Sequence, residues 1–222
     1  YSSATEMYLG GDFSSVGGIT GGSGVVRFDP SSSTWTALGS GVTGGSVYAI
    51  TSDGTNYYVG GNFTGASSVS STSRIAKWNG TSWSAIGAGL TSGTVYAIAA
   101  RSSSEVYVGG DSVISSNFPI ALYNGTSWSA MGTLSQPGMI VRTLKFNGAS
   151  DLLVGGSFQN INSLTVSTIG VARYTASTWY SMGQGFSDVY SIVLNGSEII
   201  ACGGSGISKL YSGIIGTNSE PI

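Results

Sequence analysis

The chain has 222 residues, of which 41% are hydrophobic and only 8% are charged, and its net charge is −2 at pH 7. The eight Lys and Arg residues are scattered, so no basic stripe is present to bind nucleic acid. No segment approaches the about 18 consecutive apolar residues of a membrane-spanning helix, and the single cysteine, Cys202, excludes an internal disulfide.

Three sequence markers recur in a fixed order along the chain. A GlyGly pair follows a short apolar run five times, ending at Gly11, Gly61, Gly110, Gly156 and Gly204, in steps of 50, 49, 46 and 48 residues. A polar strand with a tryptophan recurs at Trp35, Trp83, Trp128 and Trp179. An apolar run that begins with valine recurs at Val47, Val95, Val141 and Val189. A single period for all three markers predicts a repeat architecture.

Each period divides into four short predicted strands, named a to d, which in the second period cover 47–50, 57–61, 74–78 and 82–87. Asp53-Gly54 favours a tight turn between strands a and b, and Asn79-Gly80 favours one between strands c and d. No apolar pattern with a helical period extends over ten residues. Four antiparallel strands in each repeat are typical of a propeller blade.

We therefore predict an all-β fold, a five-bladed β-propeller of four-stranded antiparallel blades, as one domain over residues 1–222. The approximate blades are 1–39, 40–87, 88–132, 133–183 and 184–222. The terminal blades are expected to be incomplete, because the first lacks a strand a and the last lacks a clear strand d. Either the tail at 214–216 serves as a degraded strand d, or the chain is a piece of a longer one, which its start inside a repeat favours.

The repeats resemble a known family. The segment MYLGG followed by VVRFDPSSSTWTALG resembles a kelch repeat, with GlyGly after the second strand and tryptophan in the fourth. The fuller form, YVGGNFTGAS to SGTVYAI, is similar to propeller repeats of large fungal cell-surface polarity markers and of bacterial and viral surface proteins. The arginine that usually precedes strand a in kelch repeats is absent. The resemblance implies the fold but no particular function, since propellers serve many functions.

The residue types argue against catalysis. The chain has no histidine, which removes the commonest general base and the commonest transition-metal ligand. Galactose oxidase, an enzyme with kelch blades, holds copper partly through histidines, so its activity is not expected here. Cys202 takes the place that Leu9, Val59, Val108 and Val154 take in the other repeats, which predicts a small core side chain. We expect no catalytic residue, no metal site and no cofactor.

A column of polar residues follows the GlyGly pairs and is the strongest candidate for a ligand site. Its members are Asp12, Asn62, Asp111, Ser157 and Ser205. Such oxygens at one level could bind Ca²⁺ or sugar hydroxyls, with Phe63 and Phe158 nearby. The alternative, which we favour, is that these side chains cap the irregular chain that leaves strand b.

Other polar groups have simpler interpretations. Glu6, Glu105 and Asp151 share one position near the a–b turns, away from strand a, so they do not form a glycosidase pair. The basic column Arg27, Lys77, Arg173 and Lys209 predicts stems that pack on the sheet with charges in water. Four Asn-x-Ser/Thr sequons, at Asn62, Asn79, Asn124 and Asn195, could carry glycans in a secretory setting.

Two functional hypotheses remain. The first is a non-catalytic structural or interaction module at an extracellular, cell or virion surface, such as a cell-wall or capsid component, with other surface or assembly proteins as partners. The second is a multivalent lectin that binds glycans. Neither nucleic acid nor direct membrane insertion is expected. The long b–c and d–a loops share one rim of the predicted propeller, and we expect a partner to bind there rather than at the short Asn-Gly turns.

Overall fold

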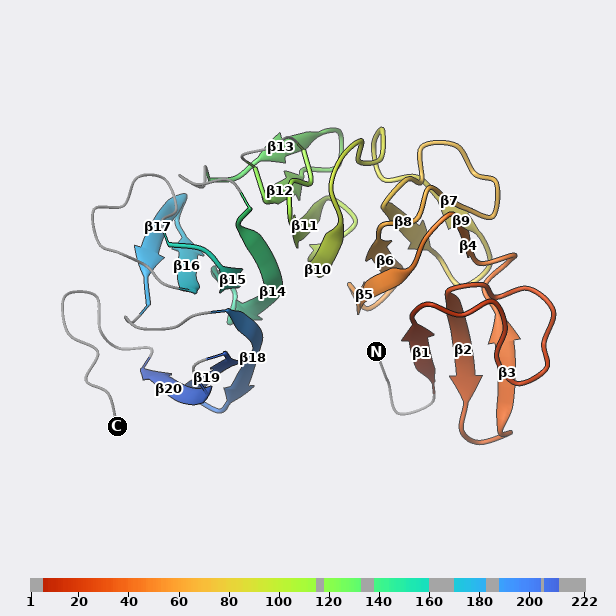
Figure 1. The fold of residues 1–222 in the computed structure, drawn as a ribbon, viewed down its shortest axis with the longest axis horizontal. Coiled ribbons are helices and arrows are strands. Elements are labelled where there is room, and N and C mark those ends of the chain that lie inside the picture. The colour runs from red at the N-terminus through yellow and green to blue at the C-terminus, as the bar shows by residue number, and fades with distance from the viewer. Residues whose placement is uncertain are drawn as a thin grey trace.

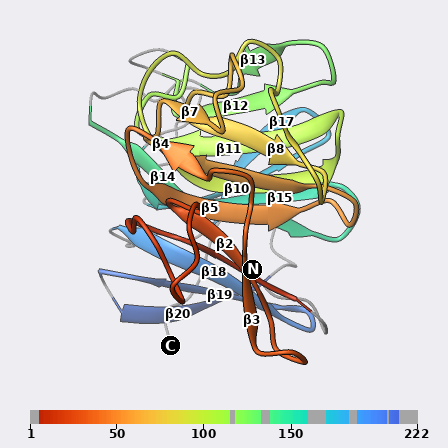
Figure 2. The ribbon, with the colours of Figure 1, turned by 90° about the vertical axis from the view of Figure 1, so that its right-hand side faces the viewer.

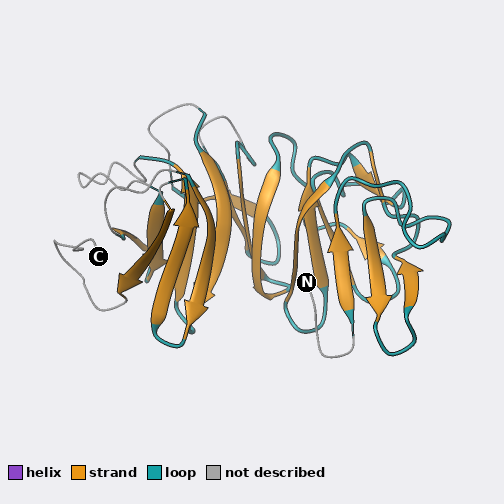
Figure 3. Ribbon diagram, turned by 60° about the horizontal axis from the view of Figure 1, so that its bottom comes forward, coloured by secondary structure: helices purple, strands orange, loops and turns teal. Residues whose placement is uncertain are grey.

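The structure of the chain is a computed structural model that describes residues 6–114, 118–132, 138–159, 170–182, 188–204 and 206–211. All regular elements in these ranges are β-strands, as predicted, and no helix occurs among them (Figure 3). Within the described residues, no helix is therefore available that could cross a membrane.

Antiparallel sheets follow one another along the chain. The first holds β1 (Met7–Gly10), β2 (Val25–Asp29) and β3 (Thr34–Ala37). The second holds β5 (Val47–Ser52), β6 (Tyr57–Gly61), β8 (Ile75–Trp78) and β9 (Trp83–Ser84). The third holds β10 (Val95–Ser102), β11 (Glu105–Gly110), β12 (Ile120–Tyr123) and β13 (Trp128–Ala130).

The fourth sheet holds β14 (Ile140–Asn147), β15 (Asp151–Ser157), β16 (Val171–Thr175) and β17 (Thr178–Ser181). The fifth holds β18 (Val189–Asn195), β19 (Glu198–Gly203) and β20 (Gly206–Tyr211). A small additional sheet pairs β4 (Val42–Thr43) with β7 (Gly65–Ala66). Four-stranded antiparallel sheets thus recur at the predicted period.

Side chains close the predicted turns. Asp53 Oδ1 accepts hydrogen bonds from the backbone amides of Thr55 and Asn56, and Gly54 adopts the positive φ of +93° that the turn requires. Asn79 Oδ1 accepts the amides of Thr81 and Ser82 in the same way. The Asp53-Gly54 and Asn79-Gly80 dipeptides therefore fix where the β5–β6 and β8–β9 hairpins reverse.

The sheets are arranged around an arc, with the first and the fifth at its two ends (Figure 1). Strands β5, β10, β14 and β18 line the inner side of the arc, and each packs beside the next. Seen from the side, successive sheets are stacked face against face and twisted relative to one another (Figure 2). The strands named a in the sequence are thus the innermost strands.

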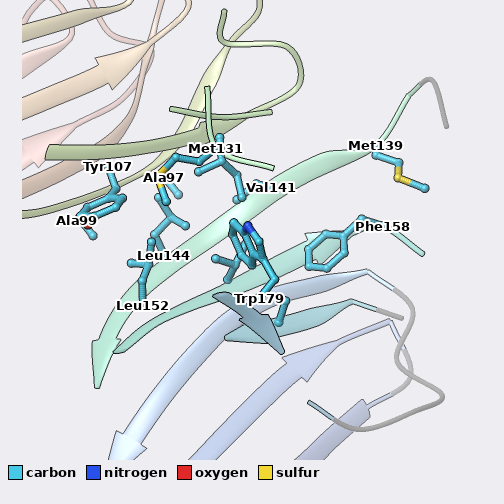
Figure 4. Packing of buried hydrophobic residues seen from close by; sticks show 13 residues of the cluster. Ala97, Ala99, Tyr107, Met131, Met139, Val141, Leu144, Leu152, Phe158 and Trp179 are labelled. Atoms are coloured by element: carbon cyan, nitrogen blue, oxygen red, sulfur yellow. The ribbon is translucent and has the colours of Figure 1, made fainter. Parts of the chain in front are cut away.

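The core lies between adjacent sheets. One cluster joins the third and fourth sheets and includes Tyr107, Val141 and Trp179 (Figure 4). The first glycine of the first four GlyGly pairs makes this packing possible: a methyl group on Gly60 would overlap Val95 of the next inner strand, and one on Gly109 would overlap Val141. The recurring glycines are therefore needed for sheet-to-sheet contact.

The tryptophans of the fourth strands lie at the same sheet boundaries. Trp83 donates its indole N–H to the carbonyl oxygen of Leu38 in the preceding sheet, and Trp128 donates to Ile86 O. Trp83 and Trp179 are buried, but Trp35 and Trp128 are only half-buried. The four equivalent tryptophans therefore differ in how far they are buried.

Cys202 does not occupy the predicted core position. In the fifth sheet Ala201 pairs with Ile192 as Val59 pairs with Ile50, so Ala201 takes the buried position and Cys202 falls one residue later, half-buried and opposite Ser191. The GlyGly pair comes one residue late: Gly203 lies opposite Val189 as the second glycines lie opposite Val47, Val95 and Val141, so Cys202 takes the place of a first glycine.

Candidate functional site

The polar column after the GlyGly pairs caps the inner strands in two sheets. Asn62 Oδ1 accepts the backbone N–H of Ser46 at 2.7 Å, and Asp111 Oδ1 accepts that of Thr94 at 2.6 Å. Both amides belong to the residue just before an inner strand. The capping interpretation therefore describes Asn62 and Asp111, whose Oδ1 atoms are already engaged.

The other members of the column have different surroundings. Asp12 is exposed, and its carboxylate accepts no hydrogen bond from a described residue. Ser157 is the last residue of β15, opposite Ile140, and Ser205 lies outside the described residues. Each member belongs to its own sheet, so the structure shows no shared constellation of these side chains.

Phe63 and Phe158 belong to the core rather than to the surface. Their exposed fractions are 0% and 3%, and each packs in a hydrophobic cluster between sheets. In this structure a surface ligand would not touch either ring. Their positions directly after the polar column predict ligand neighbours, but side chains alternate between the two faces of an extended chain, which turns these rings inward.

The shared acidic position is occupied by structural ion pairs. Glu6 Oε1 lies 2.8 Å from Arg27 Nη1, and Asp151 Oδ2 lies 3.4 Å from Arg173 Nη1. Glu105 pairs with Arg101 and accepts the hydroxyl of Tyr107. Burial, together with the Glu105 charge, raises the pKa of Tyr107 to about 12. These carboxylates therefore hold basic and tyrosine side chains on the sheets.

The four sequon asparagines are all exposed. The side-chain oxygens of Asn79 and Asn124 close turns, which leaves their amide nitrogens outward, and Asn195 Nδ2 donates to Glu198 at 3.4 Å. Glycosylation at these positions stays a prediction. Among the described residues, no group of three or more Asp, Glu or Cys side chains lies close enough together to hold a metal ion.

The loops of the predicted binding rim are held together by backbone hydrogen bonds. Thr64 N donates to Thr43 O at 2.8 Å, which joins a b–c loop to the d–a loop before it, and Leu90 N donates to Ser73 O at 3.2 Å. We call the edge of the arc that carries these connections the loop rim, and the opposite edge, with the Asp-Gly and Asn-Gly turns, the turn rim. Among the described loops, those within 40–46, 62–74 and 88–94 are thus joined to one another, which the sequence did not indicate.

Four β-bulges lie at equivalent positions, and no sequence signal indicates them. In each inner strand the pairing register shifts across the second residue: between Val47 and Ala49, Val95 and Ala97, Val141 and Thr143, and Val189 and Ser191. The bulged residues, which we call the inner row, are Tyr48, Tyr96, Arg142 and Tyr190. A bulge redirects a side chain and often occurs next to a functional site.

The inner row consists of two contacting pairs close to the loop rim. The rings of Tyr48 and Tyr96 have centroids 5.4 Å apart, and the guanidinium carbon of Arg142 lies 5.1 Å from the Tyr190 ring centroid. Arg142 Nη2 also lies 3.9 Å from Asp188 Oδ1. In the sequence, the inner-row residues are the second letters of the runs VYAI, VYAI, VRTL and VYSI. Nothing in that pattern indicates a bulge.

Antiparallel four-stranded sheets at one period, packed face to face around an arc, define a β-propeller protein. The chain belongs to the family described as the Rax2 C-terminal beta propeller domain, which matches residues 1–149. No curated protein matches the sequence.

Two solved structures have a similar fold. The extracellular domain of a protein assigned as a one-component system of B. thetaiotaomicron has a TM-score of 0.60 and 13% identity, over 93% of this chain and 26% of that one. The computationally designed Ika4 protein has a TM-score of 0.50 and 14% identity, over 75% of this chain and 91% of its own. The chain thus spans about a quarter of the first protein, and at these identities the likeness concerns the fold alone.

Proposed function

We propose that the chain is a non-catalytic binding module, a five-bladed kelch-like propeller with three-stranded terminal blades, which works at an extracellular, cell or virion surface. Its partners are other surface or assembly proteins, or glycans. It contacts neither nucleic acid nor the interior of a membrane. The family match and the repeated sheets support the propeller, and the low charge with abundant Ser, Thr and Gly supports the setting.

One observation carries the proposal: four successive inner strands present a bulged Tyr or Arg at the same level. These residue types dominate the binding energy of most protein interfaces, because they offer a large, stiff contact area with a polar tip. Near Tyr48 and Tyr96 the described loops within 40–46, 62–74 and 88–94 are hydrogen-bonded to each other, which supports a firm scaffold there. The loop rim is accordingly the binding face.

Site-specific crosslinking tests which rim binds. A photoreactive amino acid replaces Thr43, exposed on the loop rim, or Thr81, exposed on the turn rim, and the protein is mixed with surface extract of its source. The proposal predicts crosslinked partners from position 43 and none from position 81. Crosslinks from position 81 alone would show that the opposite face binds.

A further inference from the structure

The inner row exposes aromatic surface on a protein that buries most of its large apolar side chains. Tyr48 is 51% exposed and Tyr190 is 57% exposed, and both are among five large hydrophobic side chains that the described residues expose. Such rings can stack on any ligand that also has a flat apolar face.

The polar tips of the inner row have no hydrogen-bond partners among the described residues. The hydroxyls of Tyr48, Tyr96 and Tyr190 form no such bond, whereas buried Tyr58 and Tyr107 donate theirs to Asp53 and Glu105. Arg142 likewise donates no hydrogen bond to a described residue, although its guanidinium carries five N–H donors and its side chain is 28% exposed. The row therefore combines apolar faces with free donors.

The charge of the inner row is balanced. Arg142 is its single basic residue, and Asp188 lies beside it at 3.9 Å, so the pair offers donors and acceptors without a net charge. A phosphate-rich or strongly acidic ligand would need unbalanced positive charge. An extended peptide that adds a strand would need a regular backbone edge, which bulges disrupt.

We propose that the inner row is a binding site for a neutral saccharide chain. This inference rests on the proposed function and names the ligand class for its binding face. The rings of Tyr48 and Tyr190 stack on the apolar faces of sugar units. The tyrosine hydroxyls and Arg142 donate to sugar hydroxyls, and Asp188 accepts from them. The two contacting pairs give the site two halves, which suits a chain of linked units better than a monosaccharide.

Calorimetric titration with a panel of neutral hexasaccharides tests this inference. The probes are gluco-, manno- and chito-hexasaccharides, and polygalacturonate and heparin serve as charged comparisons. We expect at least one neutral probe to bind, and Tyr48→Ala and Tyr190→Ala each to weaken its binding about tenfold. Tyr190→Phe, which keeps the ring, should weaken binding less than Tyr190→Ala.

The matched control is Tyr180→Ala. Tyr180 also lies beneath an arginine, with Arg173 at 5.0 Å from its ring centroid, but it belongs to β17, far from the inner strands in its sheet. This variant should bind like the unaltered protein, and melting temperatures verify that all variants are folded.

The results that contradict the saccharide site differ from those that contradict the proposed function. Binding that is unaffected by Tyr48→Ala and Tyr190→Ala, or binding of the charged probes alone, overturns the saccharide site. If no neutral probe binds while position 43 crosslinks a protein partner, the saccharide inference fails and the proposed function stands. If neither experiment detects a partner on the loop rim, both fail.

Discussion

The indole nitrogen of Trp83 lies 2.7 Å from the carbonyl oxygen of Leu38, 45 residues earlier in the chain and in the preceding sheet. Gly39 leaves room for this contact, because a methyl group there would lie 3.3 Å from the indole ring. Trp128 repeats the arrangement with Ile86 and Gly87. A hydrogen bond and a ring thus join the second sheet to the first and the third sheet to the second at equivalent places.

This arrangement predicts that truncating equivalent tryptophans lowers the free energy of unfolding by unequal amounts. Trp83→Ala should lower the free energy of unfolding by about 3–5 kcal/mol, the range for truncating a large buried ring. Trp83→Phe, which loses mainly the hydrogen bond, should cost about 1 kcal/mol. Trp35→Ala should cost clearly less than Trp83→Ala, because Trp35 is half-buried and donates to no described carbonyl. Urea denaturation measures all three, and equal losses at positions 35 and 83 would contradict the account.

The second glycines of two GlyGly pairs, Gly61 and Gly11, should differ clearly in how much an alanine substitution destabilises the protein. A methyl group on Gly61 would overlap the carbonyl oxygen of Ser46, whereas one on Gly11 would meet only the edge of the Phe13 ring at 3.3 Å. We expect Gly61→Ala to destabilise the protein strongly and Gly11→Ala to be nearly neutral, since a side-chain ring can shift and backbone cannot. Thermal melting tests this pair of variants. Similar melting temperatures would show that strand β5 does not pack against Gly61 as described.

Asp53 should make stability depend on pH. Burial pushes the pKa of Asp53 upward, but hydrogen bonds from the Asn56 amide, the Tyr58 hydroxyl and the Thr55 amide outweigh it and hold the pKa below its ordinary value of 3.8. A lowered folded-state pKa means that the ionised carboxylate stabilises the fold above pH 3.8, and that this stabilisation is lost as the pH falls through the lower value.

Asp53→Asn keeps an oxygen for the turn but removes the charge. We expect it to lower the melting temperature at pH 7 and to have a smaller effect at pH values below the folded-state pKa of the aspartate. If Asp53→Asn lowers the melting temperature by the same amount at all these pH values, the charge of Asp53 contributes nothing to folding.

Much of the fold could be predicted from local sequence signals. Asp53-Gly54 and Asn79-Gly80 specify turns by themselves, and the recurring GlyGly and Trp positions mark the sheet boundaries, so strand order and period followed directly. The caps at Asn62 and Asp111 were foreseen as the alternative to a ligand site, because short polar side chains after a strand commonly bind nearby amides.

The remaining features depend on register, which the sequence pattern does not display. The bulges at Tyr48 and Tyr190 appear only when each inner strand is paired with its neighbour. The shift that moves Cys202 out of the core appears only in the pairing of β19 with β18, where Gly203 lies opposite Val189. Phe63 follows a polar residue that faces outward, and only the three-dimensional path of the loop shows that its ring turns into the core.

The non-catalytic proposal leads to a prediction about metals. The sequence has no histidine, and its single cysteine is half-buried in the last sheet. Transition metals in proteins depend on these ligands, so elemental analysis of the purified protein should give substoichiometric zinc and copper. One equivalent of either metal would require a site that the proposed function does not include.

Amide hydrogen exchange with the tightest-binding hexasaccharide tests the central claim, that the inner strands bind a partner at the loop rim, most directly. The account predicts slower exchange at residues 46–49, 94–97, 140–143 and 188–191, where the inner strands begin, and unchanged exchange at the turns 53–56, 79–82 and 124–127. Slowed exchange confined to those turns, with the inner strands unaffected, would contradict it.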